Sequence, residues 1–360
     1  MREQLVSEFM RFVRVDSESG NERPLLDLLS ATFEERLRAT CSIGEDGNLI
    51  ARIPAVGSDV QQPILLGAHA DTVRPGRGIE PILDDGVIRT DGSTILGADD
   101  KAAIAEILIA LEIADRRPPV EVLITHGEEI GLLGANALDR GRIESSIGFI
   151  FDTSEPNSIV IGGPTYIAVD VEIRGTSAHA GLRPEQGVSA IAVAADALNQ
   201  LQLGRLDAET TANIGTIEAG TVRNAVPDRA FLQGECRSFD HERCMAVAED
   251  MRHAFTAAAE RAGAEASVNL RVDYEASVLP KSSAAVALAI QALRAGGLEP
   301  NIKTLLGGTD AIVLQKKGIE VVVMGYGGRL AHSTKEHIFI DDMETVCRTI
   351  CRLLEIAAST

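Results

Sequence analysis

The sequence predicts a two-part α/β protein, in which an inserted α+β domain interrupts an α/β/α sandwich built on a largely parallel sheet. Three observations lead to this prediction. The 360 residues are too many for one ordinary core. Strand-like and helical patterns alternate in the first part of the chain and again at its end. The pattern changes near Gly162-Gly163-Pro164. We therefore expect one domain made of residues 1–163 and 276–360, and a second made of 164–275.

The first domain begins with two predicted helices, at residues 1–15 and 22–39, separated by the turn Ser17-Glu18-Ser19-Gly20. Strand-like apolar runs and helical patterns then alternate, with strands at 48–53, 64–68, 120–125 and 147–151 and helices at 99–114 and 131–139. After Pro280 the same alternation of helical and strand-like patterns returns, with helices at 282–296, 309–317 and 341–357 and a strand at 319–324. Such alternation is typical of strands joined by helical crossovers.

The second domain has a different pattern. Residues 166–174 alternate apolar and polar side chains as YIAVDVEIR, which is typical of a half-exposed strand. The elements that follow are a helix at 188–202, strands at 211–217 and 229–237, a helix at 241–262 and a strand at 267–274. This β-α-β-β-α-β order predicts a ferredoxin-like antiparallel sheet with both helices on one face.

The charge balance excludes two classes of partner. Lys and Arg number 34 against 53 Asp and Glu, for a net charge of −19, so the surface repels nucleic acid and anionic membranes. No apolar run of about 20 residues occurs, and the N-terminus lacks a signal-peptide core. Five scattered cysteines argue against a disulfide framework. We therefore expect a cytoplasmic protein.

Histidine and acidic residues follow several of the predicted strands, where open α/β sheets place their sites. His69 comes directly after the strand at 64–68, and Asp71 lies on the same side of an extended chain, where its carboxylate can accept the imidazole N–H. Asp99 begins a helix, and a carboxylate there suits a bridging ligand. Glu128 and Glu129 follow the strand at 120–125, so one can bind a metal while the other faces a water.

Two further candidates complete this set. Asp152 ends the strand at 147–151, and His332 follows the glycine-rich turn after the strand at 319–324. Together these histidines and carboxylates form a mixed nitrogen and oxygen set, which favours zinc, cobalt or manganese over calcium. Paired ions of this kind, about 3.5–4 Å apart, are used to hydrolyse peptides and phosphates.

The motifs resemble the aminoacylase / carboxypeptidase G / peptidase T superfamily of two-zinc amidohydrolases, and most nearly its peptidase T-like members. The resemblance runs in order along nearly the whole chain through GAHADTV, TDGSTILGADDKAAIAEIL, THGEEIGLLGA, FDTSEP, SAHAG, GTVRNAVPDRAFLQGECRSFD, LLGGTDA and AHSTKE. It implies a zinc-exopeptidase-like catalytic domain and an inserted lid and dimerisation domain. The chain is shorter than full-length peptidase T, which leaves strict tripeptide specificity open.

Roles for individual residues also follow from the resemblance. It implies that His69 and Asp152 hold one metal, Glu129 and His332 hold the other, Asp99 bridges them, Asp71 orients His69, and Glu128 is the general base. It further implies a cis peptide bond after Asp99. In the inserted domain, the resemblance implies that His179 steadies an oxyanion and that Asn224 and Arg237 bind substrate. Gly308, Thr309 and Asp310 resemble the substrate loop of the family.

The resulting expectation is two-metal-dependent hydrolysis of amide bonds in small peptides, such as removal of N-terminal residues from tripeptides. Two divalent ions per subunit are implied, zinc or else cobalt or manganese, together with a homodimer and a short peptide substrate. One alternative is an N-acyl amino acid deacylase or carboxypeptidase of the same superfamily. Another is a metal-containing binding protein without hydrolytic activity, against which the intact Glu128 argues.

Overall fold

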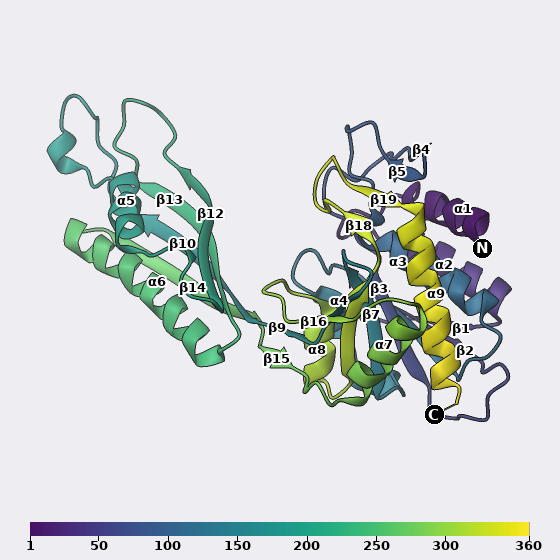
Figure 1. The fold of residues 1–360 in the computed structure, drawn as a ribbon. Coiled ribbons are helices and arrows are strands. Elements are labelled where there is room, and N and C mark those ends of the chain that lie inside the picture. The colour runs from purple at the N-terminus through teal and green to yellow at the C-terminus, as the bar shows by residue number, and fades with distance from the viewer. Residues whose placement is uncertain (360) are drawn as a thin grey trace. The chain divides into compact units, whose positions relative to one another are not determined.

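The computed structural model describes residues 1–359, and the chain divides into two compact units (Figure 1). Unit 1 consists of Met1–Gly162 and Val278–Thr360, and unit 2 consists of Gly163–Ser277. The chain thus leaves unit 1 once and returns to it once. Strands β9 (Gly162–Gly163) and β15 (Ser277–Val278) pair with each other where the chain crosses between the units.

Unit 1 is built on an eight-stranded mixed sheet. Its strand order is β1 (Thr40–Ile43), β2 (Leu49–Ile53), β6 (Val120–Thr125), β3 (Ile64–His69), β7 (Ile147–Thr153), β17 (Glu320–Gly325), β8 (Ser158–Val160) and β16 (Asn301–Lys303). The neighbours β6, β3, β7 and β17 run parallel, whereas β1, β2 and β8 pair antiparallel with their neighbours β2, β6 and β17. The carboxyl ends of four adjacent strands therefore lie along one edge.

Helices cover both faces of this sheet, and the central strands β3 and β6 are accordingly buried along their whole length. Leu66 and Val322 point into a core shared with α1 (Arg2–Val13), α2 (Arg23–Leu37), α3 (Ala98–Ile113), α7 (Ala284–Ala295) and α9 (Ile340–Ala357). Leu65 and Val321 point to the opposite face, where α8 (Asp310–Lys316) packs with the short α4 (Leu133–Ala137) beside it. This confirms the predicted α/β sandwich.

Helix α3 is buried on every side, because it lies against the sheet and is covered by α1 and α9 (Figure 1). Three ionisable residues, Asp100, Lys101 and Glu106, are nevertheless fully buried in it. The Lys101 Nζ donates a hydrogen bond to the main-chain oxygen of Val15 at 2.8 Å. Glu106 is 0% exposed, and neither of its carboxyl oxygens has a hydrogen-bond partner among residues 1–359. Burial raises the pKa of its carboxyl group, and the charge of Asp342 in α9 raises it further.

Unit 2 is an antiparallel sheet packed against two helices. The strand order is β11 (Gly204–Arg205), β12 (Thr210–Ala219), β13 (Arg229–Ser238), β10 (Thr165–Arg174) and β14 (Glu265–Tyr274), and the helices are α5 (Ala190–Gln200) and α6 (His241–Ala262). Alternate residues of β10, such as Ile167 and Val169, pack with α5 and α6 in a separate core. The predicted β-α-β-β-α-β order is therefore confirmed, with β11 added as a short edge strand.

Several short elements were not predicted. A four-stranded sheet in unit 1 joins β18 (Gly328–Arg329), β19 (His337–Phe339), β5 (Val87–Arg89) and β4 (Ile82–Asp84). Strands of two or three residues are too short to show alternation in the sequence. The helix predicted at 131–139 is also shorter: it reduces to α4, followed by a 3₁₀ turn at Arg140–Arg142. Among residues 1–359, no helix combines the length and apolar character needed to span a bilayer.

Candidate metal centre and active site

The carboxyl edge of the four parallel strands brings the predicted ligands together. His69 is the last residue of β3 and pairs in register with Thr125, the last residue of β6. Asp152 is the second-last residue of β7. The loop after β6 carries Glu128 and Glu129, which are partly buried. The remaining two ligands come from the first turn of α3, which carries Asp99, and from the loop between β18 and β19, which carries His332.

Two groups of ligand atoms share one carboxylate. His69, Asp99 and Asp152 offer atoms within 4.8 Å of one another, and so do Asp99, Glu129 and His332. The two oxygens of Asp99 face different imidazoles: Oδ1 lies 3.3 Å from the His69 Nε2, and Oδ2 lies 3.4 Å from the His332 Nε2. The His332 Nε2 is also 2.8 Å from the Glu129 Oε1. A third group of this kind joins His69, Glu128 and Glu129.

The electrostatics of this cluster fit divalent cations. Burial and the nearby Asp99 raise the pKa of Asp152 well above its ordinary value, and burial beside Asp152 does the same to the pKa of Glu128. Hydrogen bonds to Asp99 and Glu129 raise the pKa of His332 to about 10. Carboxylates packed so closely repel one another, and bound cations would relieve this repulsion. The oxygen and imidazole donors are those that zinc, cobalt and manganese bind.

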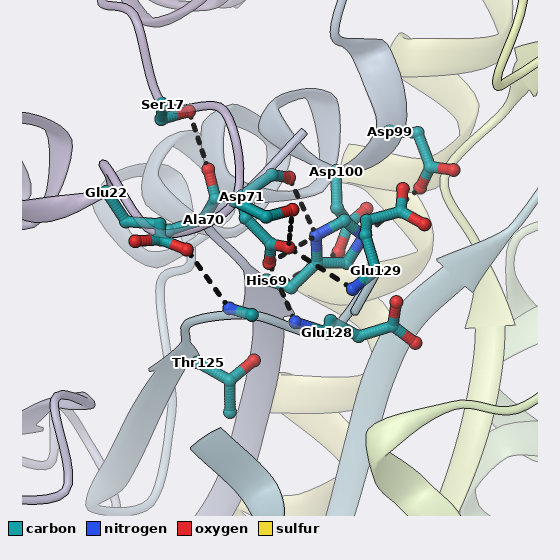
Figure 2. Close-up of polar contacts among 12 residues, drawn as sticks. Ser17, Glu22, His69, Ala70, Asp71, Asp99, Asp100, Thr125, Glu128 and Glu129 are labelled. Carbon is teal, nitrogen blue, oxygen red and sulfur yellow. Dashed lines mark hydrogen bonds and ion pairs between the residues drawn. The ribbon is translucent and has the colours of Figure 1, made fainter. Parts of the chain in front are cut away.

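A buried carboxylate holds the loop that carries Glu128 and Glu129 (Figure 2). Asp71 is 0% exposed; its Oδ1 accepts the main-chain N–H of Glu128 at 2.9 Å, and its Oδ2 accepts that of Glu129 at 3.2 Å. Ser19 donates its hydroxyl to the same Oδ2 at 2.8 Å. We expected this carboxylate to accept the His69 imidazole N–H. The shorter contact of Nδ1, at 2.9 Å, is instead with the Asp71 main-chain oxygen, and the carboxylate lies 3.5 Å away. The carboxylate oxygens are already occupied by three other donors.

The turn between α1 and α2 supports the same loop, the one that carries Glu128 and Glu129. This support was not predicted from the sequence. Glu22 is buried, and its Oε1 accepts the main-chain N–H of Gly127 at 3.2 Å (Figure 2). Ser17 donates its hydroxyl to the main-chain oxygen of Ala70 at 2.7 Å. Three consecutive N–H groups, from Gly127 to Glu129, are therefore held by carboxylates. The polar residues between the two predicted helices were the only signal for this in the sequence.

Three more carboxylates lie at this edge: Asp310 belongs to the substrate loop that the resemblance implied, whereas Asp100 and Glu336 were given no role from the sequence. Asp100 accepts the main-chain N–H of His69 at 3.2 Å, and the Asp99–Asp100 peptide bond is cis, as the resemblance implied. Asp310 accepts the hydroxyl of Thr125, and burial raises its pKa to about 6. Since Gly308 and Thr309 directly precede Asp310, they reach the same edge. Glu336 accepts main-chain N–H groups just before α3. Asp310 and Glu336 both lie within the motifs that carry the resemblance.

In unit 2, two of the three predicted substrate-binding residues lie together. His179 is exposed, and its Nδ1 accepts the N–H groups of Gly181 and Leu182, both at 3.2 Å. This fixes the proton on Nε2, where it can be donated. The main-chain oxygen of Asn224 accepts the N–H of the residue after His179 at 3.0 Å. Arg237, the third of these residues, contacts other side chains of unit 2.

The guanidinium of Arg237 forms an ion pair with Glu235 at 2.7 Å and lies over the ring of Tyr166, 4.8 Å from its centre. Tyr166 in turn stacks on Tyr274, with ring centres 5.5 Å apart. A substrate carboxylate that binds Arg237 must therefore compete with Glu235, or bind beside it.

Comparisons with known proteins agree on the architecture. Residues 162–263 match the family model of the peptidase dimerisation domain, and residues 48–153 match the model of peptidase family M28. The solved structure of aminopeptidase PepT from Bacillus cereus is 37% identical, covers 100% of this chain and 99% of its own, and has a TM-score of 0.88.

Two other solved structures are also similar over their full length. A tripeptidase from Staphylococcus aureus is 32% identical, with a TM-score of 0.93 over 100% of this chain and 99% of that one. YXEP from Bacillus subtilis, described as a dinuclear metal-binding peptidase of the M20 family, is 19% identical, with a TM-score of 0.73 over 100% and 99% of the two chains. At that identity, the last comparison shows a shared fold.

Proposed function

Since the chain belongs to the M20 peptidase family as a peptidase T-like metallo-exopeptidase, we propose that it removes N-terminal residues from tripeptides or similar short peptides, using two metal ions. The observation that carries this proposal is the position of Asp99. Its two oxygens belong to two ligand groups, one with His69 and Asp152 and one with Glu129 and His332. A bridging carboxylate between two cations needs both oxygens free in this way.

The proposed metal ligands are therefore His69, Asp99, Asp152, Glu129 and His332, and the proposed metal is zinc, with cobalt or manganese as substitutes. When bound, such ions act as Lewis acids that polarise a carbonyl group and lower the pKa of water. The donor set and the crowding of buried carboxylates support this assignment. That a dinuclear metal-binding M20 peptidase shares the fold supports it as well.

Glu128 is the proposed general base. Its carboxylate is within reach of the site, because it shares a group of possible ligand atoms with His69 and Glu129 and lies outside the proposed set of five ligands. A carboxylate oxygen of Glu128 would take a proton from the attacking water and later deliver it to the nitrogen of the leaving amine. Asp71 would keep Glu128 in place, because it accepts the main-chain N–H groups of Glu128 and Glu129.

Residues of unit 2 and of the loop before α8 would bind the substrate. His179 would donate a hydrogen bond from its Nε2–H to the developing oxyanion, a contact that typically contributes about 3–4 kcal/mol. Asn224, Arg237, Gly308 and Thr309 would bind other parts of the peptide. We also propose a homodimer formed through unit 2, supported by its match to the peptidase dimerisation domain, and a cytoplasmic location.

Chelation and metal reloading test the proposal. The protein is stripped of metal, reloaded with zinc, cobalt or manganese, and assayed with di-, tri- and tetrapeptides, N-acetylated tripeptides and N-acyl amino acids. Metal-dependent cleavage of tripeptides with a free amine is expected. Cleavage of only the acylated compounds would instead indicate a deacylase, and a lack of any cleavage with two metals bound would indicate a binding protein.

The role of Glu128 is tested separately with the variant Glu128→Gln. We expect it to keep both metals and to lose about 10²–10⁴-fold in kcat, since general base catalysis contributes on that order. Glu299→Gln is the control, because Glu299 forms only an exposed ion pair with Arg294. Loss of metal together with activity would make Glu128 a ligand, as its place in the third ligand group allows.

A further inference from the structure

Glu336 connects the two loops that carry Asp99 and His332. It lies four residues after His332 and is 1% exposed. Its main-chain N–H donates to the oxygen of Ser333 at 3.0 Å, which closes the His332 loop into a tight turn. Its side chain extends away from that turn to the start of α3.

Three main-chain N–H groups converge on the Glu336 carboxylate. Oε2 accepts those of Leu96 at 2.8 Å and Gly97 at 2.7 Å, and Oε1 accepts that of Asp99 at 3.0 Å. The donors at the start of a helix have no partner within the helix, so they need one from elsewhere. An anion at this end also interacts favourably with the helix dipole.

The backbone around these donors is not helical. Gly97 has a φ of 72°, which is the left-handed conformation, and Asp99 and Asp100 have φ and ψ values outside the helical region. The path of the chain into Asp99 is therefore not set by α3 itself. The three hydrogen bonds to Glu336 set it instead, and they fix the direction in which the Asp99 side chain leaves the backbone.

This direction matters because Asp99 must reach two imidazoles at once. Its oxygens lie 3.3 and 3.4 Å from the Nε2 atoms of His69 and His332. One side chain, that of Glu336, thus ties the backbone of the proposed bridging ligand to the loop of a second proposed ligand. If the Glu336 carboxylate is removed, the backbone at Asp99 and the loop that carries His332 can move independently of each other.

We propose that Glu336 is a positioning residue for the metal centre, which acts by holding Asp99 and His332 at a fixed separation. This inference rests on the proposed function, because it takes Asp99 and His332 as metal ligands. Residues that orient metal ligands typically contribute about 10–100-fold to metal affinity.

The variant Glu336→Gln tests the inference with little change in volume. An amide offers one acceptor oxygen and one NH₂ donor, so at least one of the three N–H groups then faces another donor. The matched control is Glu121→Gln. Glu121 is 2% exposed and likewise accepts the N–H groups of Glu144 and Ser145, but it lies near the start of β6, at the opposite end of the sheet.

Metal affinity is measured directly, by titrating metal-free protein with Co²⁺ and following its visible absorption, and by competition with a zinc chelator. Unfolding of each variant is followed by circular dichroism. We expect Glu336→Gln to bind Co²⁺ about 10–100-fold more weakly with an altered spectrum, and Glu121→Gln to bind it as the wild type does.

If the wild type binds two ions and Glu336→Gln binds Co²⁺ with the same affinity and the same spectrum, the inference is overturned. A wild type that binds no pair of ions would instead overturn the proposed function. If Glu336→Gln does not fold, Glu336→Asp replaces it. That variant keeps the charge but is too short to reach all three donors, so weaker binding is again expected and unchanged binding again overturns the inference.

Discussion

Replacing Glu106 with methionine should stabilise the protein. The side chain lies in the middle of α3 with 0% exposure, and its two carboxyl oxygens lack hydrogen-bond partners within residues 1–359. A buried polar group without a partner costs about 1–3 kcal/mol. Methionine has a similar length and is apolar, so Glu106→Met should recover roughly that amount without leaving a cavity.

The gain in the free energy of unfolding that Glu106→Met brings should also increase with pH. Burial, reinforced by the charge of Asp342, raises the pKa of Glu106 well above 4.5 in the folded state. Above pH 4.5 the unfolded chain therefore releases a proton that the folded protein retains. Stability then falls as pH rises toward the folded pKa, by up to roughly 1 kcal/mol per pH unit. Glu106→Met has no ionisable group at this position, so its stability does not fall with pH for this reason.

Urea unfolding at pH 5.5 and pH 8 checks both parts of this prediction. Circular dichroism is the suitable signal, because the chain contains no tryptophan. Glu112→Met is the control in the same helix: Glu112 pairs with Arg36 at 2.5 Å, so its replacement should bring no gain. If Glu106→Met is less stable than the wild type at both pH values, the carboxyl group has a stabilising partner in solution and the reasoning is wrong.

Two further predictions concern the loop that carries Glu128. Asp71→Asn should lower kcat about 10–100-fold, since an amide cannot accept hydrogen bonds from Glu128, Glu129 and Ser19 together. Steady-state kinetics and a measurement of the bound metal check this prediction. An unchanged kcat would show that Asp71 does not position the loop. Gly134→Ala should destabilise unit 1 by about 1–3 kcal/mol, because the added Cβ would lie 2.8 Å from the main-chain N and O of His126. In unit 2, Gly215→Ala is the control, since a Cβ there has ordinary contacts. Equal stability of the two variants would show that the His126 backbone yields easily.

Much of the fold was predictable because its main elements are long and periodic. The strand that ends at His69 is a continuous apolar run, and the strand that ends at Thr125 is apolar apart from Glu121. From Val169 to Arg174, β10 alternates between apolar and polar residues. The short strands β4, β5, β18 and β19 were not predictable, since two or three residues show no period. The cis peptide bond after Asp99 came from the resemblance and not from local sequence pattern.

Three of the ligand candidates, His69, Glu129 and Asp152, were predictable because histidine and carboxylate residues are unusual at or just after the ends of apolar strands. The groups that hold them were not. Glu22 and Glu336 act through main-chain N–H groups of segments far away in sequence, and nothing in their local pattern separates them from surface glutamates. Asp71 was expected beside His69, but its main task, accepting from the loop that follows β6, depends on tertiary structure.

The division of unit 1 into two chain segments has a consequence for synthesis on the ribosome. His69, Asp99, Glu129 and Asp152 are all made before unit 2 begins, whereas His332 and helices α7 to α9 come after it. At about 5–20 residues per second, translation of unit 2 alone takes roughly ten seconds. During that interval the carboxylate cluster lacks its last histidine and part of its covering core. A nascent chain therefore cannot complete the proposed metal centre until almost the whole protein has been made.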